Sequence, residues 1–173
     1  MSLPAQLNEL LRQVSRSFYL TMRVLPRPVR APIGLAYLLA RTSDTIADTP
    51  LIPAGERIRA LDEFRRSICS GTGLAGFGRF ALSTHVEETD QRLGIERLNP
   101  ERALLIMCAE FVEALAMLPE PERNLVREVL DTIISGQKLD LQKFAEASVE
   151  HVIALESDRE LDDYTYRVAG LSL

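Results

Sequence analysis

The chain has 173 residues, of which 46% are hydrophobic and 26% are charged, and its formal net charge is −5. This length fits one domain, or a large part of one, and a chain of this size can bury a substantial core. Because the balance is acidic and no long basic run occurs, the composition indicates a soluble globular protein and argues against a nucleic-acid-binding surface.

The N-terminus reads Met-Ser-Leu-Pro-Ala-Gln and lacks the basic stretch and apolar run of a secretory signal. We therefore expect the protein to stay in the cytoplasm. The most apolar window, residues 31–40, is far shorter than the ~20 residues that span a bilayer, so no transmembrane segment is predicted. The sequence is compatible with a peripheral association at a membrane surface.

Apolar residues recur at three- and four-residue steps over residues 7–24, which predicts a first helix. Two hydroxyl residues, Ser15 and Ser17, flank Arg16 inside it, although helix propensity does not favour them there. A serine-containing surface turn and a polar binding segment are both open interpretations. The segment Leu25-Pro26-Arg27-Pro28 then ends the helix, because proline removes a backbone donor and restricts the residue before it.

A second helix is predicted to begin near residues 28–32 and to run to Asp48. At about 100° per residue, four side chains fall within an arc of roughly 60° on one face of this helix. They are Tyr37, Arg41, Asp44 and Asp48. The opposite face carries Leu35, Leu39, Thr42 and Ile46. The face with Tyr37, Arg41, Asp44 and Asp48, called the chemical face, therefore carries functional groups, and the opposite face is suited to packing.

Asp44 and Asp48 stand one helical turn apart, about 5–6 Å between Cβ atoms, where like charges repel. Arg41 lies three residues before Asp44 and offsets part of this repulsion, and a hard divalent cation would offset more. Mg²⁺ is typically held by one or two carboxylates, several waters and substrate phosphates. The pair is a candidate Mg²⁺ site, although a solvated surface pair would explain the same spacing.

Four further helices are predicted, over residues 54–70, 79–94, 101–118 and 122–147. The connection after the first of them is rich in glycine and could form a flexible link or a lid, at Gly71, Gly73, Gly76 and Gly78. Asn99-Pro100-Glu101 is typical of a helix cap followed by an acidic first turn. Gly136 is a candidate bend in the fourth of these helices.

A last helix is predicted to be capped by Asp158 and to carry Tyr164. Cys69 and Cys108 lack the spacing of a metal site, so we expect buried free thiols in a reducing compartment. His85 is interpreted as a surface or hydrogen-bonded histidine rather than as a catalytic base. Since no run of alternating strands occurs, the predicted fold class is all-α, a bundle with its sites among facing helices.

The segment Ser15-Arg16-Ser17-Phe18, followed about twenty residues later by Tyr-x-x-x-Arg-x-x-Asp-x-x-x-Asp, resembles the squalene/phytoene synthase family of trans-isoprenyl diphosphate synthases. The resemblance covers most of residues 10–50. It returns in Tyr164-Thr165-Tyr166-Arg167-Val168-Ala169-Gly170. It implies the isoprenoid synthase fold, an all-α helical bundle around a central cavity. Prenyl tails would occupy the apolar depth of that cavity, with Mg²⁺ and diphosphate at its mouth.

The resemblance also implies roles for individual residues. The expected metal ligands are Asp44 and Asp48. The expected catalytic residues are Tyr37, Arg41 and Tyr164. Contacts to the substrate diphosphate are expected from Ser15, Arg16, Ser17 and Arg41, since hydroxyls and guanidinium groups donate to phosphate oxygens. The cavity is expected to be lined by Phe18, Val168, Ala169 and Gly170. Asp140 lies where family members carry polar residues that face the cavity.

The implied reaction is the head-to-head condensation of two molecules of farnesyl diphosphate, through presqualene diphosphate, to squalene. Mg²⁺ would assist ionisation of the allylic diphosphate, and NADPH would act at a site outside this sequence. The sequence Asp-Thr-Ile-Ala-Asp at residues 44–48 is closer to squalene synthases than to phytoene synthases. A phytoene synthase that uses geranylgeranyl diphosphate, a dehydrosqualene product and a non-catalytic assembly or interaction protein of the same fold remain alternatives.

In this family a second aspartate-rich motif follows some tens of residues after the Val-Ala-Gly segment, whereas this sequence ends at Leu173. We therefore expect residues 1–173 to be the N-terminal portion of a single squalene/phytoene synthase domain whose C-terminal part is missing. We expect this portion to be inactive alone.

Overall fold

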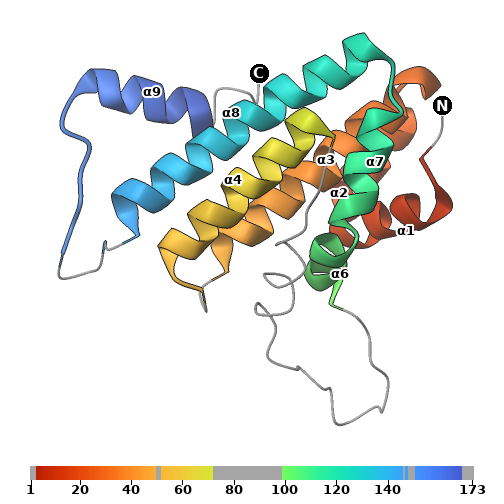
Figure 1. Cartoon of the computed structure of the whole chain (residues 1–173). Coiled ribbons are helices and arrows are strands. Elements are labelled where there is room, and N and C mark those ends of the chain that lie inside the picture. Colours follow the sequence, from red (N-terminus) through yellow and green to blue (C-terminus); the bar gives the residue numbers. More distant parts are fainter. Residues whose placement is uncertain (1–2, 50–51, 72–98, 146, 148–150, 169–173) are drawn as a thin grey trace, which may run out of the picture.

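The computed structural model describes residues 3–49, 52–71, 99–145, 147 and 151–168. Within these ranges every regular element is an α-helix (Figure 1), as the sequence predicted. The helices are α1 (Ala5–Val14), α2 (Arg16–Val24), α3 (Arg27–Asp48), α4 (Ala54–Ser70), α6 (Pro100–Ile106), α7 (Cys108–Ala116), α8 (Glu120–Phe144) and α9 (Asp158–Val168). None of the helices in the described part of the chain is long and apolar enough to cross a membrane.

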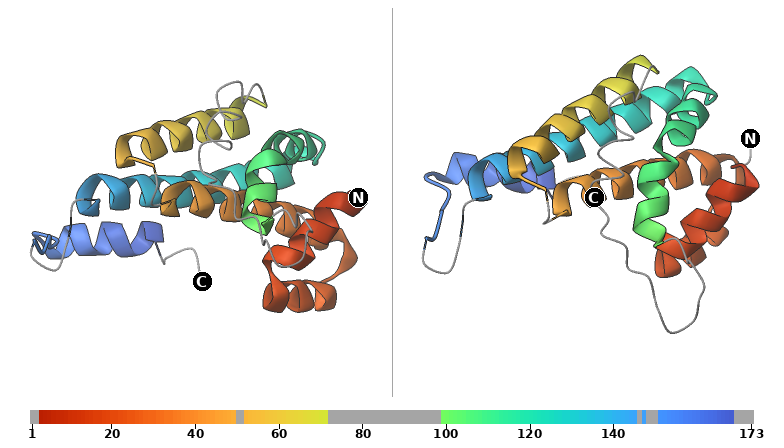
Figure 2. Two further views of the ribbon diagram at one scale, coloured as in Figure 1. Left: turned by 90° about the horizontal axis from the view of Figure 1, so that it is seen from below. Right: turned by 60° about the horizontal axis from the view of Figure 1, so that its bottom comes forward.

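Helix α3 lies at the centre of the arrangement and contacts α1, α2, α4, α6, α7 and α8. Figure 2 shows α4 and α9 on opposite sides of the layer that α3 and α8 form. The apolar face of α3 is completely buried, with Leu35, Leu39 and Ile46 at 0% exposure. Thr42 on the same face is also at 0% exposure, and its hydroxyl donates to the Leu38 carbonyl at 2.9 Å. The predicted packing face is therefore confirmed.

The prediction of a single helix over residues 7–24 is wrong, because the helix is interrupted at Ser15 and divided into α1 and α2. Ser15 has φ −138° and ψ 59°, outside the helical region, and its Oγ donates to the Leu11 carbonyl at 2.5 Å. A serine side chain that bonds its own preceding turn competes with the helical backbone pattern. The apolar period continues across this break, so periodicity alone does not reveal it.

The turn between α2 and α3 follows the proline signal; α3 begins at Arg27, just before the predicted range of 28–32, and ends at Asp48 as predicted. The Arg30 guanidinium fastens this turn by donating to the Leu25 carbonyl at 2.8 Å and to the Arg23 carbonyl at 2.7 Å. A Cβ on Gly34 would meet side-chain atoms of Leu3, Leu11 and Met22 at 2.9–3.1 Å. Glycine at this position therefore lets α1 and α2 pack closely on α3.

The helix predicted over residues 101–118 is also divided, at Met107, into α6 and α7. The backbone of Met107 has φ −86° and ψ 9°, yet its N–H donates to Ala103 and its carbonyl accepts from Phe111. The break is thus a local bend in which the hydrogen bonding continues. The predicted cap before it is confirmed, because the Asn99 side chain accepts from the Glu101 N–H at 3.0 Å.

The other boundaries agree closely with the predictions. Helix α4 spans residues 54–70 as predicted, and α8 runs from Glu120 to Phe144, close to the predicted range of 122–147. Gly136 does not interrupt α8. The Ser157 carbonyl accepts from the Leu161 N–H, so Ser157 and not Asp158 precedes the first turn of α9. The predicted helix over 79–94, His85 and the glycine-rich connection after Gly71 lie outside the described residues.

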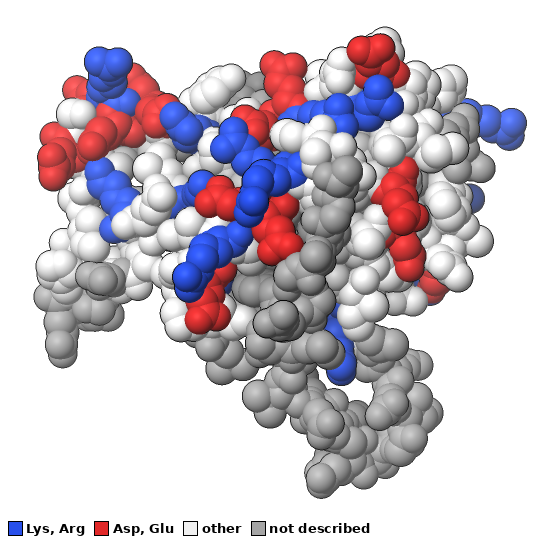
Figure 3. Space-filling model, in the orientation of Figure 1, with Lys and Arg blue, Asp and Glu red and all other residues white. Residues whose placement is uncertain are grey.

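The two cysteines are free, and only one of them is buried as predicted. Cys108 is 1% exposed, and this burial raises the pKa of its thiol. Cys69 is exposed because it lies on the outer side of the last turn of α4. Charged side chains of both signs are interspersed over the surface that α4 and α8 share (Figure 3), including the pairs Arg65–Asp131 and Lys138–Asp62 at 2.5 Å.

Candidate functional site

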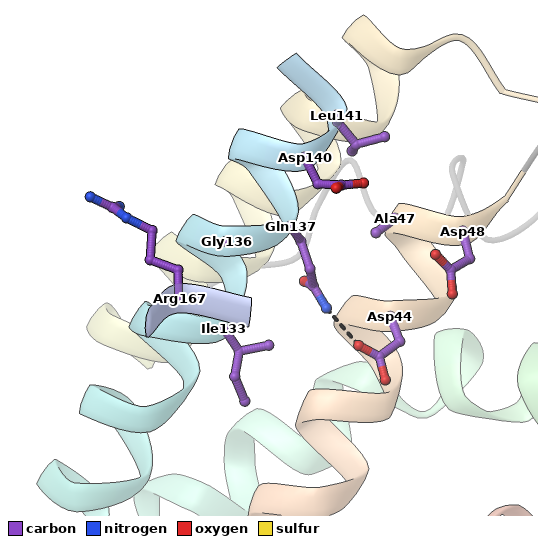
Figure 4. A pocket seen from close by; sticks show the side chains of 9 residues that line it. All are labelled: Asp44, Ala47, Asp48, Ile133, Gly136, Gln137, Asp140, Leu141 and Arg167. Carbon is purple, nitrogen blue, oxygen red and sulfur yellow. Dashed lines mark hydrogen bonds between the residues drawn. The ribbon is translucent and has the colours of Figure 1, made fainter. Parts of the chain in front are cut away.

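The chemical face of α3 borders a pocket of about 270 Å³ between α3 and α8. Carboxylate and amide groups enter it from both helices, Asp44 and Asp48 from α3 and Gln137 and Asp140 from α8 (Figure 4). The remaining lining residues are Ala47, Ile133, Gly136, Leu141 and Arg167. The two predicted metal ligands therefore line one pocket, together with the candidate Asp140.

Asp44 is the most strongly constrained group of this pocket. Its Oδ1 accepts from Gln137 Nε2 at 2.6 Å, and its Oδ2 accepts from Arg41 Nη1 at 3.3 Å. Burial raises the pKa of the Asp44 carboxyl, Arg41 opposes this, and the negative charge of Asp48 adds to it. The net effect is a raised pKa, which means that the site lacks enough positive charge to stabilise the ionised carboxylate fully.

Arg41 lies between two carboxylates of different helices. Besides its bond to Asp44, its Nη2 lies 3.8 Å from Glu101 Oε1 at the start of α6. Its Nε is buried and has no hydrogen-bond partner among the described residues. The guanidinium is thus held beside Asp44 and Glu101.

Tyr37 lies one turn before Arg41, and α2 supplies a partner for it. The rings of Tyr37 and Phe18 stack with centroids 4.3 Å apart and an interplanar angle of 14°. The structure therefore brings together the predicted catalytic Tyr37 and the predicted cavity residue Phe18. This contact places the start of α2 next to the chemical face of α3.

The segment Ser15–Ser17 was predicted to contact the substrate diphosphate, and the described part of it, Ser15, is poorly placed for that contact. Ser15 is 4% exposed, and its hydroxyl hydrogen is used by the Leu11 carbonyl, so it does not present a free donor to a diphosphate. Arg16 and Ser17 begin α2, but their side chains lie outside the described part of the structure. Their predicted contacts to diphosphate stay predictions.

Tyr164 reaches the pocket through Asp140. Its hydroxyl donates to Asp140 Oδ1 at 2.8 Å, and this hydrogen bond raises the pKa of Tyr164. Its ring also meets Phe144 edge to face, with centroids 5.7 Å apart. Tyr164 therefore links α9 to α8. The side chain of Val168 and the whole of Ala169 and Gly170 lie outside the described residues, so their predicted cavity role stays a prediction.

Sequence reasoning assigned no site role to two polar residues that line the pocket, Gln137 and Arg167. Both are far from Asp44 in the sequence; no local motif marks Gln137, and Arg167 lies within the Tyr164–Gly170 segment but was given no role. The only signal for Gln137 was its position one helical turn before Asp140. Arg167 points its guanidinium away from Asp44 in Figure 4 and donates to Asp163 at 3.0 Å and to Ser135 at 3.3 Å. It therefore borders the pocket without directing its charge into it.

The four-residue aspartate spacing also recurs in α9, at Asp158 and Asp162. Both are exposed, neither lines the pocket, and both precede Val168. Asp158 lies in the first turn of α9, where a negative charge is favoured by the helix dipole. The family resemblance predicts a second aspartate motif after Gly170, and this pair does not occupy that position.

The carboxylate oxygens at this pocket fit a hard cation that takes few ligands from the protein. No cluster of three or more histidine, cysteine, aspartate or glutamate side chains occurs within the described ranges. Mg²⁺ does not require one, because it commonly takes one or two carboxylates and completes its shell with water and phosphate oxygens. Asp44 and Asp48 supply two such carboxylates at the edge of one pocket.

Comparison with known proteins gives consistent matches. Residues 11–172 match the family described as Squalene/phytoene synthase. Squalene synthase 1 of Arabidopsis thaliana is 26% identical over 162 residues, which is 94% of this chain and 32% of that protein. The phytoene synthase of Mycobacterium tuberculosis is 40% identical over 57 residues, which is 33% of this chain and 18% of that protein.

A solved structure of TcSQS with a bound ligand superposes with a TM-score of 0.66 at 21% sequence identity. The superposition covers 96% of this chain and 40% of the other. The chain thus spans less than half the length of each of these relatives.

Proposed function

Since the chain belongs to the squalene/phytoene synthase family, we propose that it takes part in head-to-head condensation of prenyl diphosphates and that the chemical face of α3 binds their diphosphate group. Its helical fold matches that of squalene synthase structures, so the predicted isoprenoid synthase fold is confirmed. The observation that carries the proposal is the pocket that Asp44 and Asp48 both line, with Arg41 Nη1 3.3 Å from Asp44 Oδ2.

We expect Asp44 and Asp48 to hold Mg²⁺, which when bound neutralises charge on a diphosphate leaving group. The raised pKa of Asp44 supports this assignment, because a cation would stabilise its ionised form. Arg41 would add a fixed positive charge to the same diphosphate oxygens. Tyr37, held by Phe18, would position the diphosphate or turn its ring toward an allylic cation.

As substrate we propose two molecules of farnesyl diphosphate, with presqualene diphosphate as intermediate and squalene as product. Two observations favour this branch: the sequence Asp-Thr-Ile-Ala-Asp at residues 44–48 and an alignment with a squalene synthase over 94% of the chain. NADPH would be the reductant, and no residue of this chain is assigned to it. The phytoene branch is the second candidate because a phytoene synthase reaches 40% identity, although over only 57 residues.

Replacement of the two carboxylates tests the site. The double variant Asp44→Asn/Asp48→Asn should lose Mg²⁺-dependent binding of a non-ionisable farnesyl diphosphate analogue by at least about tenfold in calorimetry, since ligand and near-ligand changes commonly cost that much. Helical circular dichroism should be unchanged. The matched control is Asp158→Asn/Asp162→Asn, which has the same spacing on the exposed face of α9. Equal binding by both double variants would refute the metal assignment.

Product analysis separates the alternatives. For the full-length protein supplied with farnesyl diphosphate, Mg²⁺ and NADPH, we expect a C30 hydrocarbon, and without NADPH we expect presqualene diphosphate. A C40 product made from geranylgeranyl diphosphate regardless of NADPH would favour the phytoene branch. Binding of neither diphosphate would favour a non-catalytic interaction protein, a role that gives no reason to keep Arg41, Asp44 and Asp48 on one face.

A further inference from the structure

Gln137 makes the direct contact between α8 and the predicted metal ligands of α3. Its Nε2 donates to Asp44 Oδ1 at 2.6 Å, across 93 residues of sequence. Figure 4 shows the amide and the carboxylate meeting in the space between the two helices. Because Gln137 lines the same pocket as Asp48, it stands within the candidate cation site and not behind it.

The other end of this amide is unused. Gln137 Oε1 is buried and has no hydrogen-bond partner among the described residues, which is a costly state for an acceptor. An amide has a donor end and an acceptor end of nearly equal shape. Rotation of the terminal torsion by about 180° would therefore place the oxygen where the nitrogen now lies.

Without a cation that rotation is unfavourable, because it sets the amide oxygen against the Asp44 carboxylate. With a cation it is favourable, because Mg²⁺ takes oxygen ligands at about 2.1 Å in octahedral geometry, so neighbouring ligand oxygens stand about 3 Å apart. The terminal atom of Gln137 already lies 2.6 Å from Asp44 Oδ1. The two groups are therefore close enough to share one ion.

We propose that Gln137 is a further residue of the cation site: its amide nitrogen holds Asp44 when the site is empty, and its amide oxygen becomes a neutral ligand beside Asp44 and Asp48 when the cation binds. This inference rests on the proposed function, because the cation is the one assigned there. It gives α8 a direct part in binding the ion, which the aspartate motif of α3 alone does not.

Asp140 is the other polar residue that α8 brings to the pocket, and it is less available. Its Oδ1 accepts from the Tyr164 hydroxyl of α9 at 2.8 Å, so this carboxylate is already bonded to another helix. Lys143 and Glu160 pair at 2.7 Å and hold the same two helices together. Asp140 therefore takes part in docking α9, whereas the contact of Gln137 is with Asp44.

Three variants of the full chain test the proposal through Mg²⁺ affinity, measured by calorimetry, and through Tm measured in EDTA. Gln137→Met keeps the shape but removes both polar ends, and it should weaken Mg²⁺ binding by roughly tenfold to a hundredfold. Gln137→Glu places a second charge beside Asp44, so it should lower Tm in EDTA and strengthen Mg²⁺ binding. Gln142→Met, at an exposed position of α8, is the matched control and should change neither quantity.

A merely structural role of Gln137 would let Gln137→Met lower Tm and leave Mg²⁺ affinity unchanged, so the Mg²⁺ affinity of Gln137→Met separates the two roles. If the original chain binds Mg²⁺ and Asp44→Asn abolishes binding while Gln137→Met binds Mg²⁺ as tightly as the original chain, this inference is wrong and the proposed function stands. If the original chain binds no Mg²⁺ even when the farnesyl diphosphate analogue is present, both are wrong. If Gln137→Glu fails to fold by circular dichroism, the affinity of Gln137→Met decides.

Discussion

The carboxylate of Asp44 is subject to opposing influences. Burial and the neighbouring Asp48 disfavour its charge, whereas Arg41 and Gln137 favour it, and the outcome is a pKa above the ordinary value of 3.8. A carboxyl whose pKa is raised by folding contributes stability at low pH, and that contribution is lost as the pH rises through the folded-state pKa. At neutral pH without metal, the Asp44 carboxyl therefore contributes less stability than it does at low pH, as is common for groups kept for binding.

We accordingly expect Asp44→Asn to raise Tm slightly at pH 7 in EDTA, and we expect this gain to disappear below about pH 4, where the original carboxyl is itself protonated. A change of about 1 kcal/mol corresponds to roughly 2–4 °C in a domain of this size. The gain should not exceed that, because the side chain is 37% exposed and solvent screens it. A lower Tm for the variant at pH 7 would show that the carboxylate is net stabilising.

At this scale the sequence predicted the face of α3 but not the partners of its residues. Tyr37, Arg41, Asp44 and Asp48 share a face because they share a helical period, and a period is a local property. The contact between Gln137 and Asp44 depends on how α8 packs against α3, which no local pattern encodes. For the same reason the use of the Tyr164 hydroxyl by Asp140 could not be foreseen.

At the scale of elements, helix ends that are marked by proline, glycine or an asparagine cap were predicted closely, as α3, α4 and the start of α6 show. The breaks at Ser15 and Met107 were missed because apolar periodicity continues through both. Gly136 was interpreted as a bend, but its function in the fold is close packing. A Cβ at this position would meet the backbone carbonyl oxygen of Arg167 at 3.0 Å.

Gly136→Ala should therefore loosen α9 from α8, because the new methyl group presses on α9 backbone that cannot rotate away as a side chain can. We expect faster hydrogen exchange of the α9 amides, with exchange in α4 unchanged. Gly55→Ala is the matched control, since a Cβ there meets nothing within 4 Å and alanine is the better helix former. Equal exchange of α9 in the two variants would contradict a close-packing role for Gly136.

At the scale of the whole molecule, the candidate site depends on how helices that are distant in the sequence pack against one another. One pocket takes residues from α3, α8 and α9, and Figure 2 shows that these helices lie in adjacent layers. Partly exposed ion pairs such as Lys138–Asp62 join α4 to α8 nearby, and each contributes little by itself. A ligand that binds across α3 and α8 should consequently stabilise the molecule well beyond the residues it touches.

This expectation can be measured as a linkage between Mg²⁺ and unfolding. A ligand at 100 times its dissociation constant stabilises the folded state by about 2.7 kcal/mol, which corresponds to a rise in Tm of roughly 5–11 °C at this chain length. Because the ion would be shared between Asp44 of α3 and Gln137 of α8, hydrogen exchange should slow in both helices at once.

Screening of the net charge of −5 by any dissolved salt would also stabilise the chain, but it would not depend on these two residues. K⁺ at equal ionic strength is therefore the control for the ion, and Asp158→Asn/Asp162→Asn is the control for the protein, which should keep the full Mg²⁺ response. A shift of equal size with K⁺, or one that persists in Asp44→Asn/Asp48→Asn, would show that the stabilisation comes from general charge screening and that the two helices are not joined by an ion.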